Sequence, residues 1–395
     1  SLLSLNMITT TIAIFILLSC TFVIPDMERH KELFFIGVAK ILFNSLLVEW
    51  FYKGLEDFKY ITARSLIVRS LYVLSVFLLV KSPDDYVIYF ALNVIMVVVN
   101  ATINIVHSRQ FVMFSLSGVC MKPYLSSFIT LGVYSLLTSM YTSFNVAYLG
   151  FTCGEIEVGY YSVASKLFSI ILALFTAFTG VMLPRMSSLI AEGNVELFRT
   201  LTNKSVEALL AFVLPLIIIA MSYAPTIVNI IAGSGYVGSV LPIKIMMPLI
   251  FVIGYEQIIV IQVLMPLKKD KAILLNSFIG ATIALLANVA LVSTYKSVGS
   301  AIVWIASEST VMISAQYFVR KYIGLQFPFA QIVKRLFFAI PAFIICTYTY
   351  QDSPVRLFLT ALFVYTLYFL YEYYIVKSSI IQEYSKVLIK SLKKK

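Results

Sequence analysis

Long apolar runs recur along the whole chain, and short polar stretches separate most of them. A run of about twenty apolar residues crosses a hydrocarbon core roughly 30 Å thick as an α-helix. An outer-membrane barrel would instead show alternating segments of about ten residues, which the pattern lacks. The sequence therefore predicts an all-α polytopic membrane protein of about twelve transmembrane helices. The predicted helices cover residues 5–24, 33–51, 61–80, 86–106, 124–148, 158–182, 206–223, 240–264, 271–294, 298–319, 334–350 and 355–376.

The cations are distributed unevenly over the connections between these helices. Most of the 30 lysines and arginines fall in one alternating set of connections and in the C-terminal tail, and few fall in the other set. Connections rich in Lys and Arg stay on the cytoplasmic side of a membrane. We therefore expect both Ser1 and the C-terminus to be cytoplasmic. The net charge of +11 is interpreted in the same way, with the tail KSSIIQEYSKVLIKSLKKK contacting anionic membrane lipids rather than nucleic acid.

Sequence patterns of catalysis are missing. The two histidines, His30 and His107, fall on opposite predicted faces, and the four cysteines show no CxxC spacing. Neither GxxxxGK[ST] nor GxGxxG occurs, so no nucleotide site is expected. The sequence predicts a protein that is not an enzyme and that needs no metal or cofactor.

Five ionisable residues lie inside predicted helices: Lys40, Arg69, Lys166, Glu256 and Glu308. Each costs a few kcal/mol at bilayer depth unless it meets a partner or a water-filled cavity. Two interpretations stay open: the acids neutralise the cations as internal ion pairs, or the three cations line a cavity for a polyanionic headgroup. Amides inside the helices, including Asn93 and Asn145, either bond neighbouring helices or contact sugars.

The stretch VEWFYKGLEDFKYITARSL (residues 48–66) is dense in aromatic and charged residues. It lies between two predicted helices on the cytoplasmic side. Trp50, Phe51 and Tyr52 are expected at headgroup depth as an interfacial belt, and Arg64 is one of the cations that set topology.

Several segments together resemble bacterial polysaccharide flippases, the O-antigen (Wzx-type) and capsular transporters. They are EWFYKGLEDFKYITARS (49–65), YLGFTCGEIEVGYYSVASKL (148–167), LPRMSSLIAEGN (183–194) and QVLMPLKKDKAILLNSFIGATIALLANVALV (262–292). The resemblance implies the fold of the multidrug/oligosaccharidyl-lipid/polysaccharide exporter superfamily, with two helical bundles in a V around a central cavity. It implies a truncated N-terminal lobe of four helices at 1–106, with the family's first two helices missing. A second lobe would follow at 107–320, with an accessory helix pair and basic tail at 321–395.

The resemblance also implies a function. The protein would move undecaprenyl-pyrophosphate-linked oligosaccharide from the cytoplasmic to the outer leaflet of the bacterial inner membrane by alternating access, for O-antigen, capsule or exopolysaccharide. A polysaccharide polymerase and chain-length proteins would be partners. The expected substrate-binding residues are Lys40, Arg69, Lys166, Asn93 and Asn145.

Two further roles follow from the resemblance. Relatives often carry an acid where this chain has Asn145, so coupling to H⁺ or Na⁺ would rest on Glu256 or Glu308. Glu49, Gly54, Glu56 and Arg64 would form a cytoplasmic gate.

Three rival functions stay open at this point. A drug/cation antiporter of the same superfamily would favour an acidic cavity, which the three cations oppose. A membrane glycosyltransferase or polymerase would need acid–base clusters and long outer loops. A scaffold for polysaccharide assembly would not transport at all.

Overall fold

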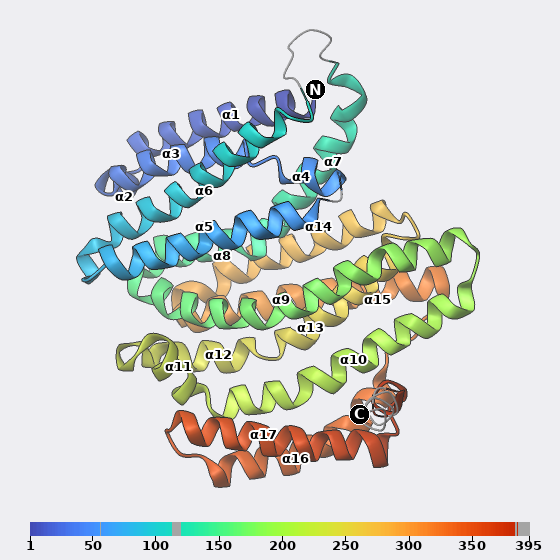
Figure 1. Cartoon of the computed structure of the whole chain (residues 1–395). Helices are drawn as coiled ribbons and strands as arrows, with labels where there is room; N and C mark the ends of the chain where they lie inside the picture. The colour runs from blue at the N-terminus through green and yellow to red at the C-terminus, as the bar shows by residue number, and fades with distance from the viewer. Residues whose placement is uncertain (56, 113–119, 384, 386–395) are drawn as a thin grey trace. The chain divides into compact units, whose positions relative to one another are not determined.

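The computed structural model describes residues 1–55, 57–112, 120–383 and 385. Within these ranges the chain forms helices and connections, and none of these residues forms a strand (Figure 1). The chain divides into two compact units, Ser1–Leu131 and Gly132–Lys395. The predicted all-α class is thereby confirmed.

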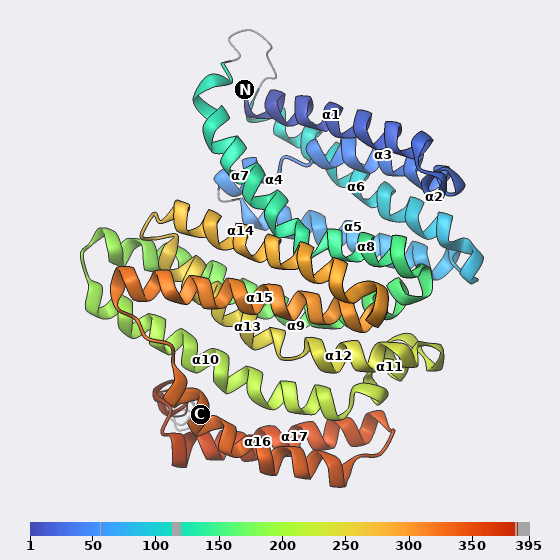
Figure 2. The same cartoon turned by 180° about the vertical axis from the view of Figure 1, so that it is seen from behind.

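The first unit is built from long helices that pack side by side. Helix α1 packs on α3, and α3 and α5 both pack on α6, as both views show (Figures 1 and 2). The bounds are α1 Leu2–Val23, α2 Pro25–Arg29, α3 Lys31–Ser45, α4 Glu49–Gly54, α5 Phe58–Leu79, η1 Pro83–Asp85 and α6 Tyr86–Ser108. Large apolar side chains such as Phe15 and Phe77 are exposed on these helices. Such an exposed apolar surface is typical of helices that contact lipid.

The second unit has a larger core. Its helices are α8 Ser143–Cys153, α9 Glu155–Ala191, α10 Val195–Ser222, α11 Ala224–Ala232, α12 Val240–Met246, α13 Leu249–Gln257, α14 Asp270–Ala287, α15 Ser293–Ile323, α16 Phe329–Thr349 and α17 Pro354–Tyr371. Short segments complete it: η2 Ser234–Ser239, η3 Ile258–Leu264, η4 Asn288–Val292 and η5 Glu372–Val376. Helix α7 (Lys122–Tyr141) contains the division between the units.

Two apolar clusters hold the second unit together. The main cluster joins α9, α10, α13 and α15 through buried side chains such as Phe168, Leu209 and Tyr255. A separate cluster around Tyr223, Phe338 and Tyr368 joins α16 and α17 to α10. The C-terminal helix pair is therefore attached through α10, and it lies beside that helix in Figure 1.

The apolar helices agree in large part with the predicted ones. In the described part of the chain, nine helices are long and apolar enough to cross a membrane. A bent pair, Ser234–Met246 with Leu249–Leu264, raises the number to ten. The bend is 46° and falls at Pro248, whose ring cannot continue a regular helix.

One predicted helix differs in form from the observed structure. The run predicted at 124–148 is divided at Thr142 into α7 and α8. The two helices predicted at 271–294 and 298–319 are both present, as α14 with η4 and as α15, within one apolar run of 54 residues, Asp270–Ile323. At about 1.5 Å per residue this run is far longer than a bilayer is thick. It turns back at Lys296, where φ is 52°, so that α14 and α15 lie side by side.

Candidate functional site

Lys40 lies on α3 in the middle of the first unit, where it contacts α6. Its Nζ donates a hydrogen bond to Asn93 Oδ1 over 2.8 Å and lies 5.7 Å from the centre of the Phe90 ring. Tyr72 of α5 interacts with Asn93 and with Tyr89. We call these five residues the Lys40 cluster. It brings together two of the predicted binding residues, Lys40 and Asn93, with three aromatic residues that the sequence did not single out.

The partners of Lys40 leave its positive charge unneutralised. An amide oxygen accepts one hydrogen bond but carries no net charge, and an aromatic ring attracts a cation only through its quadrupole. Among the described residues, no carboxylate forms an ion pair with Lys40. The internal ion pair that was left open from the sequence is therefore not formed at Lys40. A half-buried cation of this kind is suited to bind an anion.

Arg69 on α5 and Lys166 on α9 are both exposed. Neither side chain makes a hydrogen bond or ion pair with any residue in the described ranges. Arg69, which lies in the same unit as the Lys40 cluster, makes no hydrogen bond or ion pair with it. Their charges are free, but their placement in one binding site stays a prediction.

Asn145 on α8 is fully buried in the second unit. Its Nδ2 donates to Tyr161 Oη over 3.2 Å and to the carbonyl oxygen of Ser300 over 3.0 Å. These bonds join α8, α9 and α15. The amide thus has the interhelical contacts that were the alternative to sugar binding, and in this conformation it offers no exposed surface to a ligand.

Glu256 on α13 and Glu308 on α15 lie close enough to interact electrostatically, because these two helices pack against each other. Trp304 Nε1 donates to Glu308 Oε1 over 3.1 Å. Tyr134 and Tyr141 of α7 lie within electrostatic range of both carboxylates. No Lys or Arg of the described chain forms an ion pair with either acid. We call Glu256 and Glu308 the acid pair.

Two carboxylates that share an apolar environment repel each other unless a proton or a cation reduces their charge. The acid pair therefore has the chemistry of a proton or monovalent-cation site. The sequence identified both acids, because carboxylates inside apolar helices are rare. It did not identify the tyrosines and tryptophan around them, since such residues are common in membrane helices.

The predicted gate region contains an ion pair that is buried only on the Arg64 side, because the Arg64 side chain is 4% exposed and the Glu49 side chain is 37% exposed. Arg64 Nη2 lies 3.0 Å from Glu49 Oε1, and Arg64 also donates to Ser65 Oγ over 3.0 Å. Arg64 is only 6% exposed, so it is not simply a surface cation that sets topology. Gly54 ends α4, and Glu56 lies outside the described residues.

Tyr52 is not part of an interfacial belt, contrary to the expectation from the sequence. Its side chain is fully buried, and its hydroxyl donates to the carbonyl oxygen of Asn104 over 2.7 Å. Tyr60 stacks on His107 at 4.0 Å, and His107 Nδ1 lies 3.3 Å from Tyr52 Oη. These contacts attach the loop after α3 to the C-terminal end of α6. Trp50, in contrast, is 46% exposed, as a belt residue would be.

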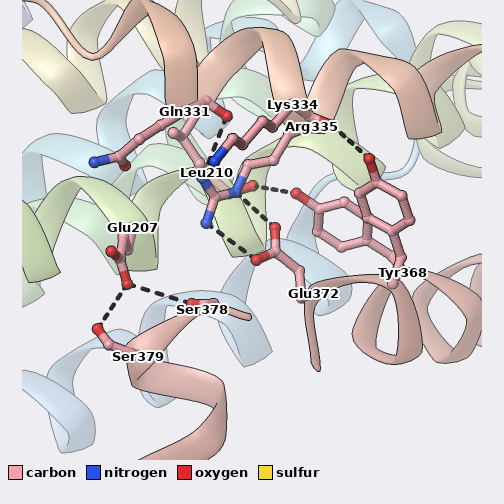
Figure 3. A network of polar contacts seen from close by, with 10 residues as sticks. Glu207, Leu210, Gln331, Lys334, Arg335, Tyr368, Glu372, Ser378 and Ser379 are labelled. Carbon is pink, nitrogen blue, oxygen red and sulfur yellow. Dashed lines mark hydrogen bonds and ion pairs between the residues drawn. The ribbon is translucent and has the colours of Figure 1, made fainter. Parts of the chain in front are cut away.

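A buried ion pair joins the C-terminal helices. Arg335 on α16 donates from Nε and Nη2 to the two oxygens of Glu372, over 2.6 and 3.0 Å (Figure 3). Tyr368 Oη donates to the carbonyl oxygen of Leu210 on α10 over 3.0 Å. The Arg335 side chain is 2% exposed and its charge is paired.

Comparisons with known proteins agree on one class. Residues 1–190 match the family model described as "Polysaccharide biosynthesis protein". A protein of Escherichia coli (strain K12) named "Putative O-antigen transporter" is 24% identical over 319 residues, which is 80% of this chain and 76% of the relative. A protein of the same name from Shigella dysenteriae is 29% identical over 163 residues, 40% of each chain.

The structure is similar to that of "Lipid II flippase MurJ, inward closed conformation". The TM-score is 0.73 at 14% identity, with 93% of this chain and 82% of that chain covered. The fold is therefore the one seen in that flippase. The resemblance to polysaccharide flippases that the sequence motifs indicated is confirmed, and these findings support a transporter rather than an enzyme.

Proposed function

We propose that this protein is a polysaccharide flippase that moves oligosaccharides linked to undecaprenyl pyrophosphate across the membrane; the family match, the relatives and the fold support this proposal. The lipid-linked head would enter from the cytoplasmic leaflet of the bacterial inner membrane and leave in the outer leaflet. Alternating access would expose the head to one leaflet at a time, and the C-terminus would be cytoplasmic.

The observation that carries this proposal is the unneutralised charge of Lys40. A pyrophosphate is a polyanion, and moving it through hydrocarbon without compensation is prohibitively costly. Lysine binds phosphate through charge-assisted hydrogen bonds, which are about twice as strong as neutral ones. A half-buried lysine held by Asn93 and Phe90 is already positioned and keeps its charge for the substrate.

The remaining residues of the Lys40 cluster suit the sugars. Tyrosine and asparagine side chains both donate and accept hydrogen bonds, as sugar hydroxyls require. Arg69 and Lys166 are proposed to contribute further positive charge, because no described acid neutralises either one. Asn145 is proposed to act only through the packing of α8, unless transport exposes it.

The acid pair is proposed to couple transport to an ion. A proton or Na⁺ would bind between Glu256 and Glu308 and reduce the repulsion between them. The ion pair of Glu49 with Arg64 is proposed to belong to a cytoplasmic gate that includes Gly54 and Glu56. A gate of this kind would open when the ion pair separates.

The proposal is tested by complementation. Lys40→Ala, Arg69→Ala and Lys166→Ala would each replace the full-length gene in its own host, and surface polysaccharide would be measured beside protein abundance. We expect loss of polysaccharide at normal abundance for Lys40→Ala, partial recovery with Lys40→Arg, and no loss for the matched control Lys31→Ala at the end of the same helix. Normal polysaccharide in all three site variants would refute the proposed binding site.

The acid pair also favours a second function, export of a cationic drug, because it presents two carboxylates without a basic partner. Overexpression distinguishes the two functions. Drug resistance, combined with intact surface polysaccharide in a strain that lacks the gene, would favour the antiporter.

A further inference from the structure

A hollow of about 410 Å³ lies between α9, α10 and the segment that follows η5. It is entirely within the second unit. Its walls are largely apolar, formed by Phe178, Met182, Leu201, Ala208 and Ile380. Phe178 and Met182 belong to one candidate membrane helix, and Leu201 and Ala208 belong to the next. We call this hollow the α9–α10 groove.

The polar residues of the groove form one ion pair and one unpaired hydroxyl. Lys204 Nζ lies 2.7 Å from Glu383 Oε2, and the Glu383 side chain is 65% exposed. Ser205 is the next residue on α10, and its Oγ is buried with no hydrogen-bond partner. A cation beside a free hydroxyl is a pair of donors that a phosphate oxygen can accept from.

The segment that covers the groove is held by few contacts. Lys377 adopts a left-handed conformation with φ of 59°, which turns the chain away from η5. Ser378 and Ser379 then donate to Glu207 Oε2 over 3.4 and 2.8 Å, so that carboxylate is already occupied. These contacts, seen at the lower left of Figure 3, and the pair at Glu383 attach the segment to α10. An exposed ion pair of this kind is weak, so a competing anion can replace Glu383.

We infer that the α9–α10 groove binds an anionic phospholipid. One acyl chain lies in the hollow against Phe178, Met182 and Leu201, and the phosphate binds Lys204 and Ser205 in place of Glu383. Apolar walls at membrane depth favour a lipid chain over water.

This inference does not depend on the proposed function, because the groove shares no residue with the Lys40 cluster or the acid pair. A protein that fails to transport polysaccharide could still bind phospholipid here. The test below measures lipid binding directly, so the two proposals can fail separately.

The experiment titrates the full-length protein in detergent with dioleoylphosphatidylglycerol or dioleoylphosphatidylcholine, and native mass spectrometry counts the bound lipid. We expect phosphatidylglycerol to bind more tightly than phosphatidylcholine. Lys204→Ala should weaken the binding of phosphatidylglycerol about fivefold, which is the effect of one cation near an anionic headgroup, and should leave the binding of phosphatidylcholine unchanged. Glu383→Gln should strengthen the binding of phosphatidylglycerol, because the variant lacks the carboxylate that competes for Lys204.

Two further variants complete the design. Ala208→Trp fills the groove and should weaken the binding of both lipids. Lys321 is an exposed lysine outside the groove, so Lys321→Ala should change the binding of neither lipid. Equal binding of the two lipids by the unmodified protein would overturn the inference, as would Lys204→Ala binding phosphatidylglycerol normally. A preference for phosphatidylglycerol that vanishes only when residues 386–395 are removed would assign the site to the tail instead and would also overturn it.

Discussion

Replacing Asn93 by aspartate should neutralise Lys40 while leaving the lysine in place. Asn93 Oδ1 already accepts a hydrogen bond from Lys40 Nζ over 2.8 Å, and aspartate has nearly the same shape as asparagine. The substitution therefore converts a cation held by an amide into an ion pair with little change in geometry. We expect the introduced carboxylate to compete directly with the pyrophosphate of the substrate for Lys40.

The size of the effect follows from the distance. Two unit charges 2.8 Å apart attract each other by about 6 kcal/mol at an effective dielectric constant of about 20. Lys40 and Asn93 are only half-buried, so desolvation and solvent screening reduce the net value to about 2 kcal/mol, within the usual range for charged hydrogen bonds. At about 1.4 kcal/mol for each factor of ten, substrate binding should weaken about thirtyfold.

The assay is transport of lipid-linked oligosaccharide in proteoliposomes, together with surface polysaccharide in the native host. Asn93→Asp should lose most of both, with normal protein abundance and undiminished thermal stability. The matched comparison is Asn93→Ala, which removes the amide but leaves Lys40 charged, so it should reduce transport less than Asn93→Asp does. Asn93→Asp that transports as well as the unmodified protein would refute the reasoning, because the charge of Lys40 would then be irrelevant.

Three further predictions concern other parts of the molecule. Arg335→Ala should lower the free energy of unfolding by about 3–5 kcal/mol, because it leaves Glu372 buried without a partner; a thermal unfolding midpoint that does not move would contradict this. Glu308→Gln should make transport insensitive to an imposed pH or Na⁺ gradient, and retained sensitivity would exclude this residue from coupling. The hydrogen bond and the charge of Lys204 lower the pKa of Glu383. The contact between the two side chains therefore stabilises the folded protein at pH values above the ordinary glutamate pKa, and this stabilisation is lost as the pH falls through the lowered pKa. The protection of residues 378–383 against hydrogen exchange, relative to their intrinsic exchange rates at each pH, should therefore fall in acid, and Glu383→Gln should abolish that fall.

The length and spacing of apolar runs were sufficient to predict most of the membrane helices. Hydropathy reports whether a segment can cross a bilayer, and it does so for each segment alone. The predicted break between 271–294 and 298–319 agrees with the turn at Lys296, but hydropathy could not show the backbone conformation there, because an unusual φ at one residue leaves the average hydropathy unchanged. The division of the 124–148 segment at Thr142 was missed for the same reason.

The charged residues of the candidate site could be predicted from the sequence, but the contacts that they make could not. Lys40 and Glu308 were identified because a charge inside an apolar helix is costly and therefore informative. Their partners depend on how each helix is rotated about its axis, which the sequence pattern fixes poorly in helices that are apolar on all sides. The pairing of Arg335 with Glu372 could not be found from the sequence for this reason, since the two residues lie 37 positions apart on different elements.

The central claim is that the free charge of Lys40 recognises the pyrophosphate of the substrate. The most direct measurement compares the affinity of undecaprenyl pyrophosphate with that of uncharged undecaprenol, in the unmodified protein and in Lys40→Gln. We predict that Lys40→Gln weakens the affinity for undecaprenyl pyrophosphate at least tenfold and leaves the affinity for undecaprenol unchanged. Equal affinity of both proteins for undecaprenyl pyrophosphate would contradict the account.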